Sequence, residues 1–275
     1  MFARMAYEYS GYEQEIAEVV DQYPLIAEHF VLTMRSPKIA AVASPGQFLM
    51  LRTPGESFDP LLRRPLSIMN ANKKEKTIQV YYKAVGKGTV GMANAKEGMT
   101  LDLVGPLGNG FQVNPDRPIP ILIAGGYGVA PLYFMAREIR KLNKKGTIYA
   151  LLGARTEKLM AFENEFSELK CELFVSTDDG SLGIQGNVID LLRKVLERET
   201  NKEQLQVYAC GPHPMMPAVA LHSKQENIAC QVSLEEVMAC GYGICMGCVY
   251  PTADDHYKRV CTAGPVVEAR EVRWN

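Results

Sequence analysis

The pattern of apolar and polar positions changes once along the chain, near residue 110. Between about residues 15 and 104, short runs rich in Val, Ile, Leu and Tyr are separated by Pro, Gly, Ser and Asn, as in GQFLMLR, RPLSIMN, TIQVYYKAV and MTLDLVG. Runs of this length, separated by turn residues at this spacing, are typical of an antiparallel barrel. We therefore expect an all-β domain over residues 1–110.

After GPLGNGF, apolar strands alternate with amphipathic helices. The run IPILIA precedes a segment in which apolar residues repeat at i, i+3, i+4 and i+7, namely Leu132, Met135, Ala136, Ile139 and Leu142. TIYALLG, CELFVS and QVYAC follow as further strands, with helices expected near 162–169 and 188–196. This alternation predicts a doubly wound parallel sheet over residues 111–229.

Residues 119–136 form the longest uncharged stretch, and its length raises the question of a membrane span. Pro120, Gly125, Gly126, Gly128 and Pro131 interrupt it, so we interpret it as a strand, a turn and the start of a helix. The N-terminal residues show no apolar core typical of a secretory signal, and the cytoplasm is the expected location.

Length and charge narrow the classes of function. A chain of 275 residues exceeds the roughly 100 to 200 residues of one domain, so two compact units and a small appendage are expected. With 30 Lys and Arg against 31 Asp and Glu, the net charge of -1 lacks the basic excess that nucleic-acid binding requires. Neither nucleic acid nor a membrane is an expected partner.

Four of the seven cysteines lie close together near the C-terminus. Cys240, Cys245, Cys248 and Cys261 have the spacing C-x4-C-x2-C-x12-C, whose first three positions match the plant-type 2Fe-2S pattern. Thiolates suit iron and sulfide, and four are needed for two irons. We predict a 2Fe-2S domain over residues 230–275.

Two alternatives to the cluster stay open. Zinc also accepts four cysteines, although structural zinc sites usually pair two CxxC-like segments and only one is present here. The four thiols could also bind nothing. Cys171, Cys210 and Cys230 lie outside the pattern, and we interpret them as small buried hydrophobic residues.

Two loops of the second domain are candidates for holding a nucleotide. AGGYGVAP, with Gly125, Gly126 and Gly128, lies between a predicted strand and helix, where backbone amides can hold a pyrophosphate. CGPHPMM follows the last predicted strand and should reach the same sheet edge, which adds Cys210, Gly211 and Pro212. A mere tight turn is the alternative, because the spacing is not G-x-G-x-x-G.

The residue that would select between NADH and NADPH is not evident. Arg155 stands after TIYALLG, where an acidic residue usually contacts the ribose, and Asp178 and Asp179 occur later, in TDDGS. Each could simply face solvent.

The first domain contains two segments suited to a flavin nucleotide. RRPLS places a cation and a hydroxyl beside a proline at a strand start, and YYKAVGKGT places an aromatic strand before a Gly-rich turn. Arginine binds phosphate well, and turn amides can hold a pyrophosphate. An exposed arginine and an ordinary hairpin are the alternative interpretation.

Taken together, these segments resemble the ferredoxin-NADP reductase-like flavoproteins, and within them the electron-transfer subunits of class 1B dihydroorotate dehydrogenase. RPLS, YYK, GKGT, GPLGNGF, AGGYGVAP, TDDGS, ACGP and SLEEVMACGYGICMGCVY occur in that family's order and span nearly the whole chain. The resemblance implies FAD bound by Arg64, Pro65, Leu66, Ser67, Tyr81, Tyr82, Lys83, Gly88 and Thr89, with the nicotinamide nucleotide reaching it between the AGGYGVAP and ACGP loops.

The resemblance also implies a partner and a pathway. A separate FMN-containing catalytic subunit would oxidise dihydroorotate in pyrimidine (UMP) biosynthesis, in a heterotetramer of two of each subunit. Electrons would pass through the 2Fe-2S cluster and FAD to NAD+, and no residue of this chain is assigned a catalytic acid-base role. One departure is visible, since Ala263 stands where the family commonly has an acidic residue.

Two other functions stay open. Diaphorase-like subunits of a hydrogenase, a sulfur reductase or a bifurcating transhydrogenase share the barrel, the nucleotide domain and a cysteine cluster. A zinc-stabilised binding module without a redox role belongs to a different class.

Overall fold

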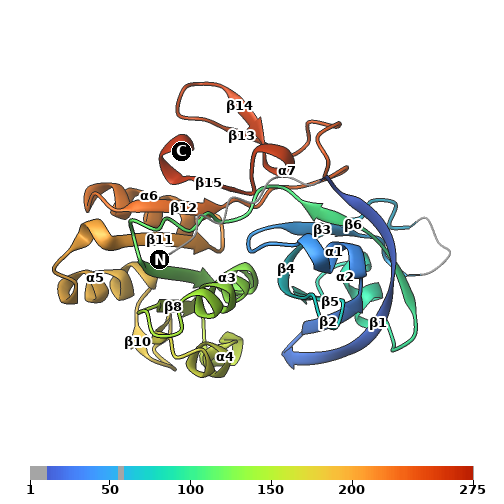
Figure 1. Cartoon of the computed structure of the whole chain (residues 1–275), viewed down its shortest axis with the longest axis horizontal. Helices are drawn as coiled ribbons and strands as arrows, with labels where there is room; N and C mark the ends of the chain where they lie inside the picture. The colour runs from blue at the N-terminus through green and yellow to red at the C-terminus, as the bar shows by residue number, and fades with distance from the viewer. Residues whose placement is uncertain (1–10, 55–58, 275) are drawn as a thin grey trace.

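The computed structural model describes residues 11–54 and 59–274. Six antiparallel strands close into a barrel in the order β1-β2-β5-β4-β3-β6, which confirms the predicted all-β unit (Figure 1). The barrel strands are β1 (Glu13–Ile26), β2 (His29–Arg35), β3 (Phe48–Leu51), β4 (Arg64–Asn72), β5 (Thr77–Lys83) and β6 (Thr100–Leu107). Two short helices accompany them, α1 (Pro37–Val42) and α2 (Lys87–Ala93).

The second unit is built on a sheet in the order β10-β9-β8-β7-β11-β12-β15, and every pair except β12 with β15 is parallel. Its parallel strands are β7 (Ile119–Gly125), β8 (Tyr149–Ala154), β9 (Glu172–Thr177), β10 (Ile184–Gln185), β11 (Leu205–Cys210) and β12 (Ala229–Ser233). The connecting helices are α3 (Val129–Leu142), α4 (Glu163–Glu168), α5 (Val188–Arg198) and α6 (Met215–Gln225). Short 3-10 turns cover Gly126–Gly128, Glu157–Leu159 and Lys202–Gln204.

Helices cover both faces of this sheet, as the alternating side chains of β7 show. Leu122 packs with α3 and α4, whereas Ile121 and Ile123 pack with α5 and α6. Central parallel strands are buried on both faces, which explains the continuous apolar run IPILIA. The doubly wound prediction is confirmed, and the long uncharged stretch forms β7, a turn and the start of α3.

Local chemistry sets the helix limits. Asn187 caps α5 by accepting from the amide of Ile189 at 2.9 Å, and Asp190 accepts from the amide of Asn187 at 3.0 Å. In α3 the predicted apolar stripe is buried at Leu132, Met135, Ala136 and Ile139. Leu142 is exposed because the helix ends there.

The last segment of the chain lies against both units (Figure 1). It contains β13 (Val249–Pro251), β14 (Tyr257–Arg259), α7 (Val260–Ala263), β15 (Val266–Glu268) and a 3-10 turn at Ala269–Glu271. β12 and β15 join the sheet, so the parallel sheet continues past residue 229 and receives a strand from beyond the cysteines. The domain limits 1–110, 111–229 and 230–275 stay a prediction.

The barrel and the sheet unit are joined by packing. Phe134 of α3 is buried in the barrel core, and Met69 and Tyr81 of the barrel are buried beside α3. No helix among the described residues is long and apolar enough to cross a membrane.

Candidate functional site: a pocket beside the cysteine loop

Three parallel strands end at one edge of the sheet, facing the barrel. Cys210 at the end of β11 is in register with Ala124 of β7 on one side and with Ser233 of β12 on the other. The turns that leave these strands therefore emerge together, at the edge where open parallel sheets bind ligands.

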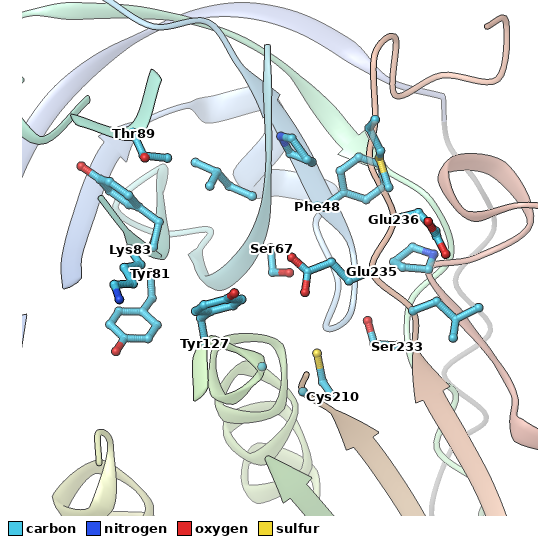
Figure 2. Close-up of a pocket in the computed structure, with 18 of the residues that line it drawn as sticks. Phe48, Ser67, Tyr81, Lys83, Thr89, Tyr127, Cys210, Ser233, Glu235 and Glu236 are labelled. Atoms are coloured by element: carbon cyan, nitrogen blue, oxygen red, sulfur yellow. The ribbon is translucent and has the colours of Figure 1, made fainter. Parts of the chain in front are cut away.

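A pocket with a cavity volume of about 220 Å³ opens between this edge and the barrel strands β4 and β5. Figure 2 shows Ser67, Tyr81 and Lys83 on the barrel side, with Tyr127 and Cys210 facing them from the sheet. Ten predicted site residues line it, namely Pro65, Leu66, Ser67, Tyr81, Tyr82, Lys83, Thr89, Gly128, Cys210 and Gly211. The structure thus brings the barrel segments and both Gly-rich loops into one cavity.

Five predicted residues are not among those that line the pocket, namely Arg64, Gly88, Gly125, Gly126 and Pro212. A Cβ atom at Gly128 would collide with the carbonyl oxygen of Cys210, and one at Gly125 would lie 2.8 Å from Pro212. The two loops therefore meet, as predicted, and these glycines permit their close approach. Gly126 has a φ of +53° and faces open space.

The two neighbouring arginines of RRPLS have different partners. Arg63 pairs with the Asp102 carboxylate at 2.5 Å and also donates to the Asp102 carbonyl at 2.7 Å, which ties β4 to β6. Arg64 donates to the Leu62 carbonyl at 2.6 Å, and its guanidinium fills the space that a side chain at Gly88 would need. Arg64 thus lies at the start of α2, beside Thr89 of the pocket.

The titratable groups of the pocket include two carboxyls, Glu235 and Glu236. Burial, followed by the charge of Glu236, raises the pKa of Glu235. Burial also raises the pKa of Tyr127, with the charge of Glu235 as the next cause. Burial raises the pKa of Cys210 to about 12, so this thiol stays protonated.

The cysteine loop lies close to the pocket in sequence. Met238 lines the pocket, and Cys240, two residues later, is the first cysteine of the pattern. The thiol of Cys240 lies beside that of Cys245, and the thiol of Cys261 lies beside that of Cys248. Among the described residues, no three Cys, His, Asp or Glu side chains are arranged to hold a single metal ion. The four thiols lie as two neighbouring pairs, and Cys240 of one pair also acts on Cys261 of the other.

Backbone amides point at these sulfur atoms. Burial alone would raise the pKa of Cys240, but hydrogen bonds from the amides of Cys245, Tyr242 and Ile244 and from the Cys245 thiol lower it to about 6. Burial and then the Cys248 thiol raise the pKa of Cys261. Cys245 is exposed, whereas Cys248 and Cys261 are buried, so one pair lies nearer to solvent.

The other cysteines agree with a packing role. Cys230 is buried on β12, and burial raises its pKa to about 12. Burial raises the pKa of the half-buried Cys171 to about 11. Cys210 differs, because it lines the pocket.

The charged residues considered for the ribose lie at the ends of β8 and β9. Arg155, Asp178 and Asp179 are all exposed. Asp179 accepts from the hydroxyl of Ser181 at 2.6 Å and from its amide at 3.0 Å. These contacts lower the pKa of Asp179 and fix the loop after β9.

Sequence reasoning missed one wall of the pocket. This wall is formed by Tyr127, Phe48, Val85 and Pro265 and by five residues after β11, namely Ser233, Leu234, Glu235, Glu236 and Met238. One signal in the sequence could have predicted this wall. A third strand, β12, ends at the same edge of the sheet and leads directly into SLEEVM.

Comparison with known families agrees with this arrangement. Residues 122–221 match the family model described as an oxidoreductase NAD-binding domain. Residues 235–273 match the iron-sulfur cluster binding domain of dihydroorotate dehydrogenase B. The chain is therefore an oxidoreductase chain with an NAD-binding domain and an iron-sulfur binding domain.

Relatives extend over nearly the whole chain. The electron transfer subunit of dihydroorotate dehydrogenase B (NAD+) from Desulforamulus reducens is 34% identical over 94% of this chain and 97% of its own. That of Bacillus caldolyticus is 39% identical over 90% and 94%. The chain belongs to this family, the electron transfer subunits of NAD-dependent dihydroorotate dehydrogenase B.

Solved structures show the same fold. A chain from a study of NADH-dependent reduced ferredoxin-NADP oxidoreductase and flavin-based electron bifurcation aligns with a TM-score of 0.81 and 30% identity, over 94% of this chain and 90% of that one. Phthalate dioxygenase reductase aligns with a TM-score of 0.63 and 16% identity, over 88% and 87%, which shows likeness of fold.

Proposed function

We propose that this chain carries electrons between an FMN-containing partner subunit and NAD+, through a 2Fe-2S cluster and FAD. One observation supports this most directly. A single pocket is lined by the barrel segments, by both Gly-rich loops and by the segment that leads to Cys240. A flavin in this pocket would lie between the nucleotide domain and the cysteine loop.

The residues present fit a flavin nucleotide. Tyr81, Leu66 and Phe48 supply apolar and aromatic surface, and Ser67 supplies a hydroxyl, the usual mixture of a cofactor site. Arg64 beside Gly88 and Thr89 supplies a cation where the phosphates would lie. We assign FAD to Arg64, Pro65, Leu66, Ser67, Tyr81, Tyr82, Lys83, Gly88 and Thr89.

The pairing of the thiols favours a two-iron cluster over zinc. One zinc ion needs all four sulfurs around one point, whereas each iron of a 2Fe-2S cluster takes two thiolates. Cys240 with Cys245 and Cys248 with Cys261 form two such pairs. The amides that point at Cys240 would also stabilise negative charge on a cluster.

The AGGYGVAP and ACGP loops would hold the nicotinamide nucleotide. Gly125, Gly126, Gly128, Cys210, Gly211 and Pro212 form this edge, and Gly128, Cys210 and Gly211 also line the pocket. A flavin exchanges electrons singly or in pairs, which suits an exchange between a one-electron cluster and a two-electron nicotinamide. The residues of this chain bind and orient both nucleotides and limit the access of water.

The partner follows from the relatives' names. They are called subunits of dihydroorotate dehydrogenase B (NAD+), so the partner would oxidise dihydroorotate in pyrimidine biosynthesis in the cytoplasm. A heterotetramer of two of each subunit is the assembly that we propose.

A second candidate is supported by one comparison. The structure with the TM-score of 0.81 comes from an enzyme of electron bifurcation, which resembles the diaphorase-like alternative. In that case the partner would accept or donate electrons without dihydroorotate.

Reconstitution distinguishes these functions. Co-expression with a dihydroorotate dehydrogenase catalytic subunit should give a complex that contains two irons per copy of this chain and reduces NAD+ with dihydroorotate. Cys245→Ser should abolish the iron-sulfur absorption and NAD+ reduction, whereas Cys171→Ser, outside the pattern, should retain both. A chain that contains zinc without iron would exclude the electron-transfer proposal, and an iron-loaded chain that does not co-purify would favour the second candidate.

A further inference from the structure

Arg259 places a positive charge on the cysteine loop, and the proposed ligands leave this side chain without a role. It is the last residue of β14, two residues before Cys261, and it is half-buried. Its Nη1 atom donates to the Gly243 carbonyl at 2.6 Å and lies 3.8 Å from the Sδ atom of Met246. Within the described residues it forms no ion pair, so no carboxylate there neutralises its charge.

The two contacts of this guanidinium lie in different intervals of the cysteine pattern. Gly243 belongs to the C-x4-C interval, and Met246 belongs to the C-x2-C interval that follows it. Arg259 itself belongs to the x12 interval that leads to the last cysteine. One positive charge therefore lies where all three intervals between the four cysteines meet.

The contact with Gly243 also reaches the sulfur atoms through the backbone. The Gly243 carbonyl shares its peptide unit with the amide of Ile244, which points at the Cys240 sulfur. A cation on the carbonyl oxygen polarises that peptide and strengthens its N–H as a donor, because hydrogen bonds in a chain reinforce one another. The amide of Gly243, held in place by the same contact, points at Cys261. Both thiol pairs are thus affected.

Positive charge and hydrogen-bond donors near a 2Fe-2S cluster change its reduction potential. Reduction adds one negative charge to a group that already has four thiolate ligands. Nearby cations and amides that donate to sulfur stabilise this extra charge, so they raise the potential. A half-buried cation is more effective than one surrounded by water, because bulk solvent screens it less.

We propose that Arg259 is a positioning residue that raises the reduction potential of the cluster, by its charge and by polarising the peptide between Gly243 and Ile244. The inference rests on the proposed function, because it requires a 2Fe-2S cluster at the four cysteines. A higher potential favours the entry of an electron from the partner subunit. One side chain outside the ligand set therefore adjusts the balance of electrons between the partner and the flavin.

The potential of the cluster tests this role without turnover. The purified full chain, loaded with FAD and with its iron-sulfur cluster, is titrated anaerobically with dithionite and mediator dyes at fixed pH. The low-temperature EPR signal of the reduced cluster gives the ratio of reduced to oxidised cluster at each potential. Only loaded molecules contribute to this signal, so partial loss of the cluster from a variant does not move the midpoint.

We expect a graded series of midpoints. At the wild-type midpoint, Arg259→Gln should lower the ratio of reduced to oxidised cluster roughly tenfold, a shift of about 59 mV for a one-electron couple. Arg259→Lys keeps the charge but not the planar guanidinium, so it should lower the ratio only about threefold. Lys258→Gln is the matched control and should keep the wild-type midpoint, because Lys258 is exposed and lies 3.4 Å from the carboxylate of Glu271.

Three results would overturn the inference. These are a midpoint in Arg259→Gln at or above that of the wild type, equal shifts in Arg259→Gln and Arg259→Lys, or the same shift in Lys258→Gln. If Arg259→Gln holds no cluster, Arg259→Lys decides, and an unshifted midpoint there would overturn the inference. A wild-type chain without the EPR signal of a reduced cluster would instead remove the proposed function, and this inference with it. Failure of the inference alone would leave that signal intact.

Discussion

At the scale of single residues, the two adjacent arginines at the start of β4 serve different purposes. Arg63 and Asp102 are both largely buried, and their charged hydrogen bond joins β4 to β6. Arg64 has no carboxylate partner among the described residues, and its hydrogen bonds go to the carbonyls of Leu62 and Arg63. The first arginine stabilises the barrel, while the second leaves its charge for a ligand.

Replacing each arginine in turn should separate these roles. Arg63→Ala should lower the free energy of unfolding by about 1.5–3 kcal/mol, the usual worth of a hydrogen bond to a charged group. Arg64→Ala should change the free energy of unfolding of the flavin-free protein little, but should lower FAD retention. Urea unfolding and flavin content after gel filtration measure the two effects. An unchanged flavin content in Arg64→Ala would remove that residue from the flavin site.

At the scale of elements, the cysteine loop is seated on the barrel. Gly241 has a φ of +82°, and a Cβ there would lie 2.5 Å from Cγ of Met50 on β3. Phe48, two residues earlier on the same strand, lines the pocket. Arg259 holds the loop from the other side, by donating to the Gly243 carbonyl at 2.6 Å. β3 therefore fixes the distance between the pocket and the loop.

The Gly241→Ala variant should lose its cluster faster than the wild type, because the substitution disturbs the packing of the loop against β3. Gly98→Ala is a matched control, since Gly98 has a φ of +83° but open space around it. In both variants, backbone strain should lower the free energy of unfolding by about 1–2 kcal/mol. Only in Gly241→Ala would the new Cβ atom also collide with Met50. The rate at which iron-sulfur absorbance decays in a chelator checks this. Equal decay rates in the two variants would show that contact with Met50 has no part in holding the loop.

The elements also show how far sequence alone could lead. The strand, turn and helix of residues 119–142 were predictable because their apolar periods are local. The cysteine pattern was equally local. The pairing of β12 with β15 was not predictable, because it joins residues more than thirty apart by backbone hydrogen bonds that any sequence can make. Glu235 belongs to no sequence pattern, and only the structure shows that it lines the pocket.

At the scale of the whole molecule, the C-terminal segment is part of the main body. Val260, Tyr250 and Val267 are buried in the core beneath α5 and α6. Pro265 accepts from the amide of Leu234 at 2.9 Å, and the amide of Asn109 donates to the Gly264 carbonyl at 2.6 Å. The segment thus supports the sheet, the pocket and the connection to the barrel at once.

A chain that ends at Glu236 should therefore fail as a flavoprotein, even though the predicted flavin and nucleotide segments are all retained. It would expose the edge of β12, which favours self-association, and would lose buried Val residues worth on the order of 1.5 kcal/mol each. A full-length variant with all four clustered cysteines changed to Ser keeps β15 and Pro265, so it should lose the cluster but retain FAD. Flavin content, elution volume and the urea midpoint compare the two proteins. If the truncated chain matched the four-serine variant in all three, the C-terminal segment would be a separable appendage, and the cluster would be its sole contribution.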